Sequence, residues 1–352
     1  MKWKQNLLLI TTFLIACALL IFPSEAAEGA RKGLGYCLQI LIPSLYPFMV
    51  LAVFLVKSSL SDKIGHVFEA PSRVLLKLPG SAATAVFMSM IGGYPTGGRS
   101  VAALYEAGSI NGEQASRMLC FCVNSGPAFV ISAVGAGFLG NRQAGYYLFV
   151  SQITASVLLG LICGATAKRG ADISPTRRRA PQKALTALIS SAADAVRAMM
   201  NMCCFVILFA SVLNLLRIWV REPGSSAALS GFLEVTGGCS DFAQLHLPLW
   251  AVSLIIGWGG LCVHFQILSM IEQIPIKLPR FFLFRVLHGL FAAAITFGLE
   301  KLFPLSEETF SNTSATLVPA FSGSGPAAAA LIILCAAFIL YIPSEKVELY
   351  RR

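Results

Sequence analysis

Two glycine-rich segments interrupt apolar stretches of this chain, and they constrain its fold more than any other feature. They are Gly92–Arg99, with the sequence GGYPTGGR, and Asn124–Pro127, with the sequence NSGP. Each lies beside or within an apolar run long enough for a bilayer, where backbone N–H and C=O groups normally pair within a helix. Glycine and proline there predict broken or re-entrant helices, which are tolerated only where protein or a water-filled cavity covers the bare peptide groups. In membrane proteins such breaks are typical of binding sites.

The composition is that of a polytopic membrane protein. Of the 352 residues, 56% are hydrophobic and 12% are charged, which is about half the charged fraction of a soluble domain. The net charge of +10 comes from basic residues in short loops between apolar runs, where they orient helices. No interleaving of aromatic and basic residues suggests single-stranded nucleic acid. We therefore expect an all-α membrane protein with no nucleic-acid partner.

The apolar runs predict about eight spanning helices plus re-entrant hairpins, and five parts of the chain. The basic segment 168–184 is the clearest marker of orientation, so it is predicted to be cytoplasmic. We expect a multi-pass protein of the cell membrane whose two termini are also cytoplasmic. The run Leu7–Phe22 also fits a cleaved signal peptide, although the spans that follow it favour a retained helix. The parts are an N-terminal membrane anchor (1–33), a first repeat (34–167), the cytoplasmic linker (168–184), a second repeat (185–300), and an external loop, last span and cytoplasmic tail (301–352).

The two repeats share one order of elements: a span, a short re-entrant piece, a glycine-broken span and an unbroken span. Placing the basic loops inside sends the two opening spans in opposite directions, so the repeats are predicted to be inverted. Inverted repeats with paired broken helices point to a substrate site at the membrane midplane. The matched elements are Leu34–Val56, Gly80–Tyr94, Gln114–Leu139 and Gly145–Ala167 in the first repeat, and Ala195–Val220, Leu229–Gly238, Leu247–Ile271 and Phe281–Leu299 in the second.

In the first repeat, Gly92–Arg99 is the more specific candidate for a binding segment. Its glycines allow the backbone to approach a ligand, and amides at the start of a half-helix favour anions. The alternative is a tight turn between packed helices, with Arg99 paired to Glu106. We expect Arg99 and the amides of Gly97 and Gly98 to hold an anionic or carbonyl group of the solute. The residues expected to contact the solute are Tyr94, Thr96, Gly97, Gly98 and Arg99.

Asn124 and Ser125 are the second candidate pair. Pro127 cannot donate to the preceding turn, so it frees a carbonyl near Val123. Asn124 and Ser125 are then expected either to hydrogen-bond a solute or to cap a simple proline kink.

In the second repeat, the candidates are Glu234 and Thr236 at the end of the short piece, and His264 and Gln266 within a span. An ionisable residue inside a membrane span is a functional candidate by default, so we expect opposite-side contacts or proton coupling. Glu234 is the expected partner of His264, and a satisfied core histidine is the alternative.

Four other ionisable residues are expected to be structural. Asp194 and Arg197 lie three residues apart near a membrane edge and are predicted to pair with each other. Arg285 and His288, near the inner edge, are predicted to extend to the headgroups.

No catalytic or cofactor motif is present, so the chain is not expected to be an enzyme. All ten cysteines are expected to be structural, because none has zinc-site spacing. The expected partners are the bilayer and a small polar solute, and a second copy of the chain is left open. The alternatives are an intramembrane enzyme, suggested by Cys262 and His264 in one span, and a membrane scaffold.

The two glycine-rich segments, together with Leu233–Gly238 and Gly259–Gln266, resemble those of the sporulation integral membrane protein YlbJ family of endospore-forming bacteria. This resemblance implies a polytopic protein of the cell membrane with a nucleoside recognition, or gate, domain and a role in spore formation. The same domain occurs in concentrative nucleoside transporters and spore maturation membrane proteins. The expectation is thus a transporter-like protein that binds or moves a solute.

Overall fold

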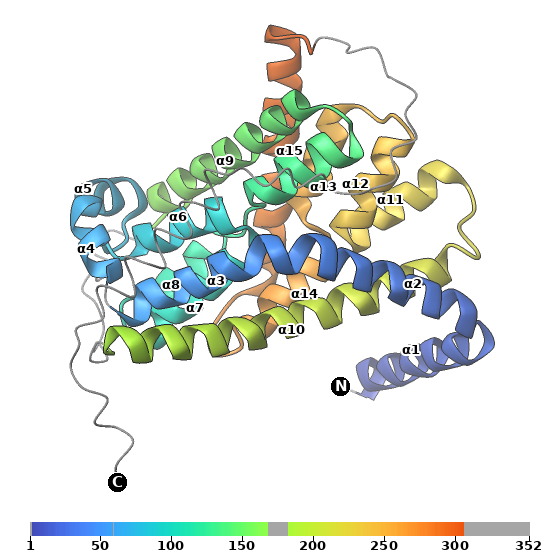
Figure 1. Ribbon diagram of the computed structural model, residues 1–352, viewed down its shortest axis with the longest axis horizontal. Helices are drawn as coiled ribbons and strands as arrows, with labels where there is room; N and C mark the ends of the chain where they lie inside the picture. Colours follow the sequence, from blue (N-terminus) through green and yellow to red (C-terminus); the bar gives the residue numbers. More distant parts are fainter. Residues whose placement is uncertain (1, 59, 168–181, 306–352) are drawn as a thin grey trace. The chain divides into compact units, whose positions relative to one another are not determined.

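The computed structural model describes residues 2–58, 60–167 and 182–305, which form helices and loops with no strand among them (Figure 1). This confirms the predicted all-α class. Most of the basic linker, the loop after Leu305, the predicted last span Ala327–Tyr341 and the C-terminal tail lie outside the described residues.

The first half of the described chain begins with α1 and with a long, bent run made of α2, η1 and α3. The π-type turns of η1 precede Pro43, and the bend between the two straight parts of this run is 59°. The elements are α1 (Lys2–Ile21), α2 (Pro23–Tyr36), η1 (Cys37–Leu41), α3 (Ile42–Lys57), α4 (Leu60–Val67), α5 (Glu69–Pro71), η2 (Ser72–Leu76), α6 (Ala82–Gly92), α7 (Tyr94–Glu106), α8 (Gly112–Met118), η3 (Ala128–Phe138) and α9 (Arg142–Ala165).

The second half begins with α10, a helix of 33 residues that packs along α2 and α3 (Figure 1). Most of the predicted opening span Ala195–Val220 lies in this helix, which begins earlier, at Ala184, and ends at Leu216. The elements are α10 (Ala184–Leu216), α11 (Pro223–Leu233), α12 (Val235–Gln244), α13 (Leu249–Trp258), α14 (Gly260–Met270) and α15 (Leu278–Leu302).

Four stretches of the described chain are long and apolar enough to cross a bilayer, and the bent run of α2, η1 and α3 would make a fifth. The four are α9, α10, α13 with α14, and α15. The sequence predicted about eight. The predicted broken span Gln114–Leu139 is not among the four, because it consists of two short helices, α8 and η3, separated by an irregular segment.

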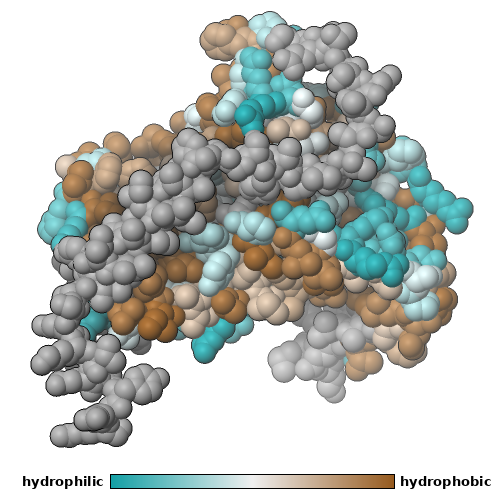
Figure 2. All heavy atoms as spheres, in the orientation of Figure 1, coloured by the Kyte–Doolittle hydropathy of each residue, from teal (hydrophilic) through white to brown (hydrophobic). Residues whose placement is uncertain are grey.

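The exposed surface of these helices is rich in large apolar side chains. On the face shown in Figure 2, hydrophobic residues cover broad areas between smaller polar patches. Examples at least 40% exposed are Val157 of α9, Leu208 of α10, and Leu283 and Leu290 of α15. Apolar surface on this scale is expected of helices whose solvent is lipid.

Polar side chains join α9, α13 and α15 inside this apolar environment. The Thr296 hydroxyl lies 2.8 Å from the hydroxyls of both Ser151 and Ser253, and Gln152 Nε2 donates to the Ser253 carbonyl at 2.9 Å. All four side chains are fully buried. Hydrogen bonds between buried hydroxyls and amides stabilise helix association where lipid gives no hydrophobic driving force, so this cluster fixes the two unbroken helices, α9 and α15, against α13.

Candidate functional site

The first helical hairpin, which we call hairpin 1, consists of α6 and α7 and turns at Gly93. The φ of Gly93 is +83°, a conformation that L side chains rarely adopt. A Cβ atom at this position would lie 3.1 Å from the Gly126 amide nitrogen. Glycine at 93 therefore allows both the turn and its close contact with the irregular segment of the first half.

The second hairpin, hairpin 2, consists of α11 and α12 and turns at Glu234. The Glu234 carboxylate accepts hydrogen bonds from the backbone amides of Thr236 at 2.8 Å and Gly237 at 2.6 Å. It thereby caps α12, whose first amides have no partner within the helix. The sequence placed the end of this short piece at Thr236-Gly237-Gly238, but these residues form the first turns of α12 instead.

The second-half span breaks at Gly259, between α13 and α14. Gly259 has φ +85° and follows the last residue of α13, which matches the predicted break. Next to it, Gly260 lies against the tip of hairpin 2, since a Cβ there would be 3.0 Å from the Leu233 carbonyl oxygen. Each hairpin tip thus packs against the break of its own half.

In the first half, the break covers residues 119–127, and side chains from distant helices satisfy its carbonyl groups. Arg285 of α15 donates to the carbonyl oxygens of Val123 and, at 2.7 Å, Cys120. Ser156 of α9 donates to the Phe121 carbonyl at 2.8 Å. The carbonyl that Pro127 was predicted to free is therefore present, and its donor is Arg285.

The two hairpin tips, the first-half break and α14 line one small cavity, which we call the central hollow. Its volume is about 30 Å³, which is room for one or two water molecules. Most of its lining is apolar, and its polar side chains come from the two tips and from α14. The lining residues are Leu41, Leu45, Gly93, Tyr94, Pro95, Gly126, Phe129, Met202, Val206, Glu234, Val235, Thr236, Val263 and Gln266.

Four of the predicted site residues line this hollow: Tyr94, Glu234, Thr236 and Gln266. Tyr94 also connects the two halves, because its hydroxyl donates to the Ile256 carbonyl at the end of α13. Gln266 Nε2 lies 3.1 Å from Cys262 Sγ. The structure therefore brings together candidates that lie up to 172 positions apart in the sequence (Tyr94 and Gln266).

Thr96, Gly97 and Gly98 lie inside α7 and do not line the hollow. The Thr96 hydroxyl donates to the Gly92 carbonyl at 2.9 Å, and the Gly97 amide donates to the Gly93 carbonyl at 3.1 Å. A Cβ at Gly97 would lie 2.0 Å from the Cys122 carbonyl oxygen. The expectation that the Gly97 amide is available to an anion is wrong here, because helix α7 uses it.

Arg99 points into an ion-pair cluster instead of the hollow. Its guanidinium contacts Glu106 at 2.9 Å, as the alternative interpretation predicted, and Asp194 of α10 at 3.1 Å. Lys57 also binds Asp194, at 2.9 Å. The predicted pair of Asp194 with Arg197 is therefore wrong: Asp194 points toward α3 and α7, and Arg197 is exposed.

Asn124 and Ser125 are buried within the first-half break and do not line the hollow. Asn124 Nδ2 donates to the Ser89 hydroxyl at 3.0 Å, which joins the break to α6. The other end of the amide, Oδ1, has no hydrogen-bond partner among the described residues. Asn124 thus secures hairpin 1 and keeps a free acceptor within the protein.

His264 is buried in an aromatic cluster and does not pair with Glu234. Its ring lies 4.3 Å from that of Trp258 and 5.1 Å from that of Phe282, measured between centroids. Trp258 in turn donates to the Phe232 carbonyl of α11 at 3.0 Å. The expected Glu234–His264 contact is replaced by the capping bonds of Glu234, so His264 packs as a core residue.

Arg285 and His288 are the residues whose position the sequence did not predict. Each is 1% exposed, so neither extends to the headgroups. An arginine buried inside a spanning helix must find acceptors within the protein. The acceptors are the carbonyls of Val123 and Cys120 in the first-half break, more than 160 residues away in the sequence. The sequence signal that could have predicted this contact is an arginine inside one span together with a proline-containing break in another.

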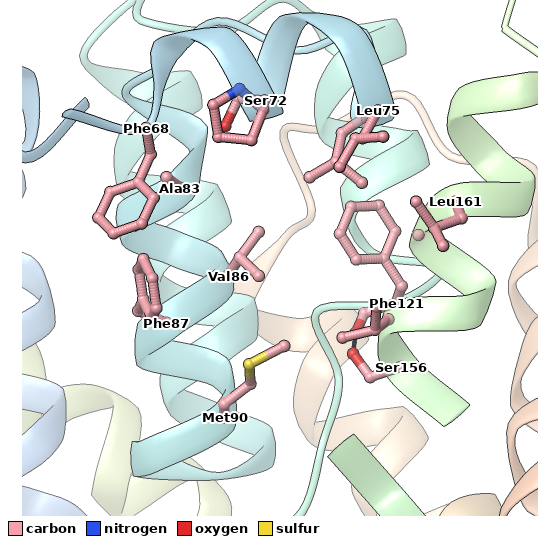
Figure 3. Close-up of a pocket in the computed structure, with 14 residues that line it drawn as sticks. Phe68, Ser72, Leu75, Ala83, Val86, Phe87, Met90, Phe121, Ser156 and Leu161 are labelled. Carbon is pink, nitrogen blue, oxygen red and sulfur yellow. Dashed lines mark hydrogen bonds between the residues drawn. The ribbon is translucent and has the colours of Figure 1, made fainter. Parts of the chain in front are cut away.

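Two apolar grooves flank the hairpins. The first, of about 180 Å³, lies between η2, α6 and α9, and Figure 3 shows Phe68, Phe87, Met90 and Phe121 around it. The second, of about 350 Å³, lies between α11, α13 and α15. The α9 wall of the first contains Val157, Gly160 and Leu161, and the α15 wall of the second contains Val286, Gly289 and Leu290. The same residue types at the same spacing thus line corresponding helices of the two halves.

The hairpins also share a short sequence. Thr96-Gly97-Gly98 lies in the first turns of α7, and Thr236-Gly237-Gly238 lies in the first turns of α12. This sequence begins three residues after the tip residue Gly93 and two residues after the tip residue Glu234.

The chain is 25% identical to the sporulation integral membrane protein YlbJ of Bacillus subtilis (strain 168), over 85% of this chain and 84% of the relative. The similarity thus extends over most of both chains. No family model and no solved structure matches it. The apolar helices, together with this similarity to an integral membrane protein, identify a membrane protein with several spans.

Proposed function

We propose that this protein acts in endospore formation as a membrane protein that binds, and moves across the membrane, a small polar solute at the central hollow. The observation that carries the proposal is the convergence of both hairpin tips, the first-half break and α14 on one cavity. The role in spore formation rests on the name of the relative. The gate-type architecture expected from the resemblance is part of the same proposal.

The recurrence of elements supports a repeat, and the opposite directions that the basic loops predict for the two opening spans make it an inverted one. In each half a hairpin precedes a broken segment, which precedes an unbroken helix: hairpin 1, residues 112–138 and α9, then hairpin 2, α13 with α14, and α15. The shared Thr-Gly-Gly sequence and the matching groove walls support the same correspondence. Transporters built from inverted repeats bind their substrates where the broken helices meet.

The polar groups of the hollow favour a solute with hydrogen-bond donors. Glu234 is the charged residue among those that line it, and its carboxylate keeps lone pairs beyond the two that accept from Thr236 and Gly237. Arg99, expected from the sequence to hold an anion, is paired with Glu106 and Asp194. We therefore infer a solute that carries hydroxyl or amino groups and no negative charge.

The size of the hollow implies that a hairpin must move to admit such a solute. A volume of about 30 Å³ is well below the several hundred Å³ of a small-molecule pocket. The conformation described here would therefore be the closed state of the site.

A non-transporting scaffold for spore envelope assembly is the second candidate. The observation that favours it is that Arg285 and Ser156 already occupy carbonyls of the first-half break, so that this break is stable without a solute. A scaffold would bind membrane partners, and substitutions of the polar residues in the hollow would not change its activity.

Thermal shift of the purified full-length protein separates these candidates, because a ligand that binds only the folded state raises its stability. The panel contains neutral polyols and nucleosides, organic amines, and carboxylates and phosphates. We expect stabilisation by members of the first two groups and loss of that stabilisation in Glu234→Gln. The matched control is Glu222→Gln, because Glu222 caps α11 through the amides of Gly224 and Ser225 in the same way, but on the exposed surface. No stabilisation by any class, or equal stabilisation in both variants, would refute the solute site.

A further inference from the structure

Two ion-pair clusters hold the two hairpins to opposite ends of α10. Asp194, in the third turn of this helix, binds Arg99 of α7 at 3.1 Å. Arg217, at its C-terminal end, binds Asp241 of α12. In both cases the partner belongs to the second helix of a hairpin, so each hairpin has its own charged contact with the same long helix.

The Asp194 cluster extends over three helices. Lys57, at the end of α3, binds Asp194 at 2.9 Å, and Arg99 also binds Glu106 within α7 at 2.9 Å. Gln273, after α14, donates to Glu106 at 3.1 Å. The side chains of Arg99 and Asp194 are 12% and 25% exposed, so solvent screens the cluster only in part.

The Arg217 cluster is smaller and consists of one ion pair and a serine on the other hairpin. Its guanidinium donates to Asp241 and, at 2.8 Å, to the Ser230 hydroxyl, which itself donates to Asp241. Ser230 belongs to α11 and Asp241 to α12. Arg217 therefore contacts both helices of hairpin 2.

The geometry relates both clusters to the hollow and to the bilayer. Arg99 lies six residues beyond the tip residue Gly93, and Asp241 lies seven beyond the tip residue Glu234. Asp194 and Arg217 are 23 positions apart on α10, or roughly 35 Å along a helix that rises 1.5 Å per residue. That distance is about the thickness of the hydrocarbon core, so the clusters lie near opposite faces of the membrane.

We propose that these two clusters are ion-pair latches that control access to the central hollow, the Asp194 latch from one face of the membrane and the Arg217 latch from the other. This inference rests on the proposed solute site and adds its regulation. Both latches are formed here, and the hollow is closed. Release of one latch frees one hairpin tip and opens the hollow toward that face only.

Two native cysteines report on the two hairpins. Cys122 is fully buried, and its carbonyl packs on Gly97 of α7, whereas Cys239 is fully buried within α12. The experiment measures residue-resolved labelling of full-length protein by a membrane-impermeant maleimide, in membrane vesicles of both orientations. The variants are Asp194→Asn and Asp241→Asn, and the control is Arg73→Gln, which removes an exposed ion pair with Glu69.

We expect Asp194→Asn to raise the labelling rate of Cys122 at least about tenfold from one face, and Asp241→Asn to raise that of Cys239 similarly from the other face. The charge exchange Arg217→Asp with Asp241→Arg should restore protection of Cys239. Unchanged labelling in both variants, labelling of both cysteines from both faces, or failure of the charge exchange would overturn the proposal. No solute is added, so a failure here is distinct from a failure of the Glu234 binding test.

Discussion

Arg285 donates hydrogen bonds to the carbonyl oxygens of Val123 and Cys120, across more than 160 residues of sequence. Arg285 is 1% exposed, and within the described part of the chain its guanidinium donates to backbone carbonyls and pairs with no carboxylate. Guanidinium groups suit such a site because their five donors have fixed directions. This contact explains how an irregular segment with a proline is stable inside the protein.

Replacement of Arg285 by Met should destabilise the protein strongly. The apolar side chain leaves two buried carbonyls without a donor, and each unsatisfied group costs about 1–3 kcal/mol. The stability of Arg285→Lys should lie between those of the wild type and Arg285→Met, because an ammonium cannot reach both carbonyls in the same planar arrangement. The melting temperature in detergent measures the effect, and we expect a decrease of at least about 5 °C for Met. Arg221→Met, on the exposed loop before α11, is the control and should leave the melting temperature unchanged.

Gly93→Ala should also destabilise the protein, because φ +83° is strained for alanine and its Cβ would lie 3.1 Å from the Gly126 amide. The expected loss is about 1–3 kcal/mol. Gly35→Ala in α2 is a matched control, since a Cβ there meets no atom within 4 Å. It should be neutral or stabilising by up to about 1 kcal/mol. Equal melting temperatures for the two variants would mean that the tip of hairpin 1 does not have this geometry.

These residues show which parts of the fold the sequence could predict. Glycine and proline act through their own backbone, so the breaks near Gly93, Asn124–Pro127 and Gly259 followed from local chemistry. Contacts between residues far apart in the sequence could not be predicted in this way. Asp194 was assigned to the nearby Arg197 because spacing along a helix is visible in a sequence, whereas its contacts with Arg99 and Lys57 depend on how α10 packs.

The site could be predicted to a similar extent. Tyr94, Glu234, Thr236 and Gln266 were selected because polar residues beside a break are costly in lipid, and they do line one hollow. Gly97 was assigned a ligand role because glycine allows close approach and an amide at the start of a half-helix favours an anion, but its packing against Cys122 requires the absence of a side chain. A glycine needed for close approach and a glycine needed for a ligand look the same in a single sequence.

Tyr94→Phe should weaken the contact between the two halves. The Tyr94 hydroxyl donates to the Ile256 carbonyl, one of the last carbonyls of α13, which have no partner within that helix. Its removal should cost about 1 kcal/mol, seen as a small decrease in melting temperature. Tyr146→Phe, on the exposed side of α9, should have no effect. An unchanged melting temperature in Tyr94→Phe would show that this hydrogen bond does not contribute to stability.

Acidification should loosen the start of α11. Hydrogen bonds from the side chain and amide of Ser225 and from the Gly224 amide lower the pKa of Glu222 from its ordinary 4.5. A lowered folded-state pKa means that the cap stabilises the helix fully above about pH 4.5 and is lost as the pH falls through the folded-state value. Hydrogen exchange of the amides of residues 224–226, corrected for intrinsic rates, should show protection at about pH 6 that decreases as the pH falls below about 4.5. In Glu222→Gln the protection should not depend on pH, and a wild type without pH dependence would contradict the assignment.

The meeting of both hairpin tips at one hollow inside the bilayer is tested most directly by photo-crosslinking in native membranes. Tyr94 is replaced by p-benzoylphenylalanine, and the cross-linked peptides are identified by mass spectrometry. Because Tyr94 shares the hollow with Glu234, Val263 and Gln266, the expected products join α7 to the segment 233–270. Cross-links to lipid alone, or only to helices of the first half, would contradict a shared site.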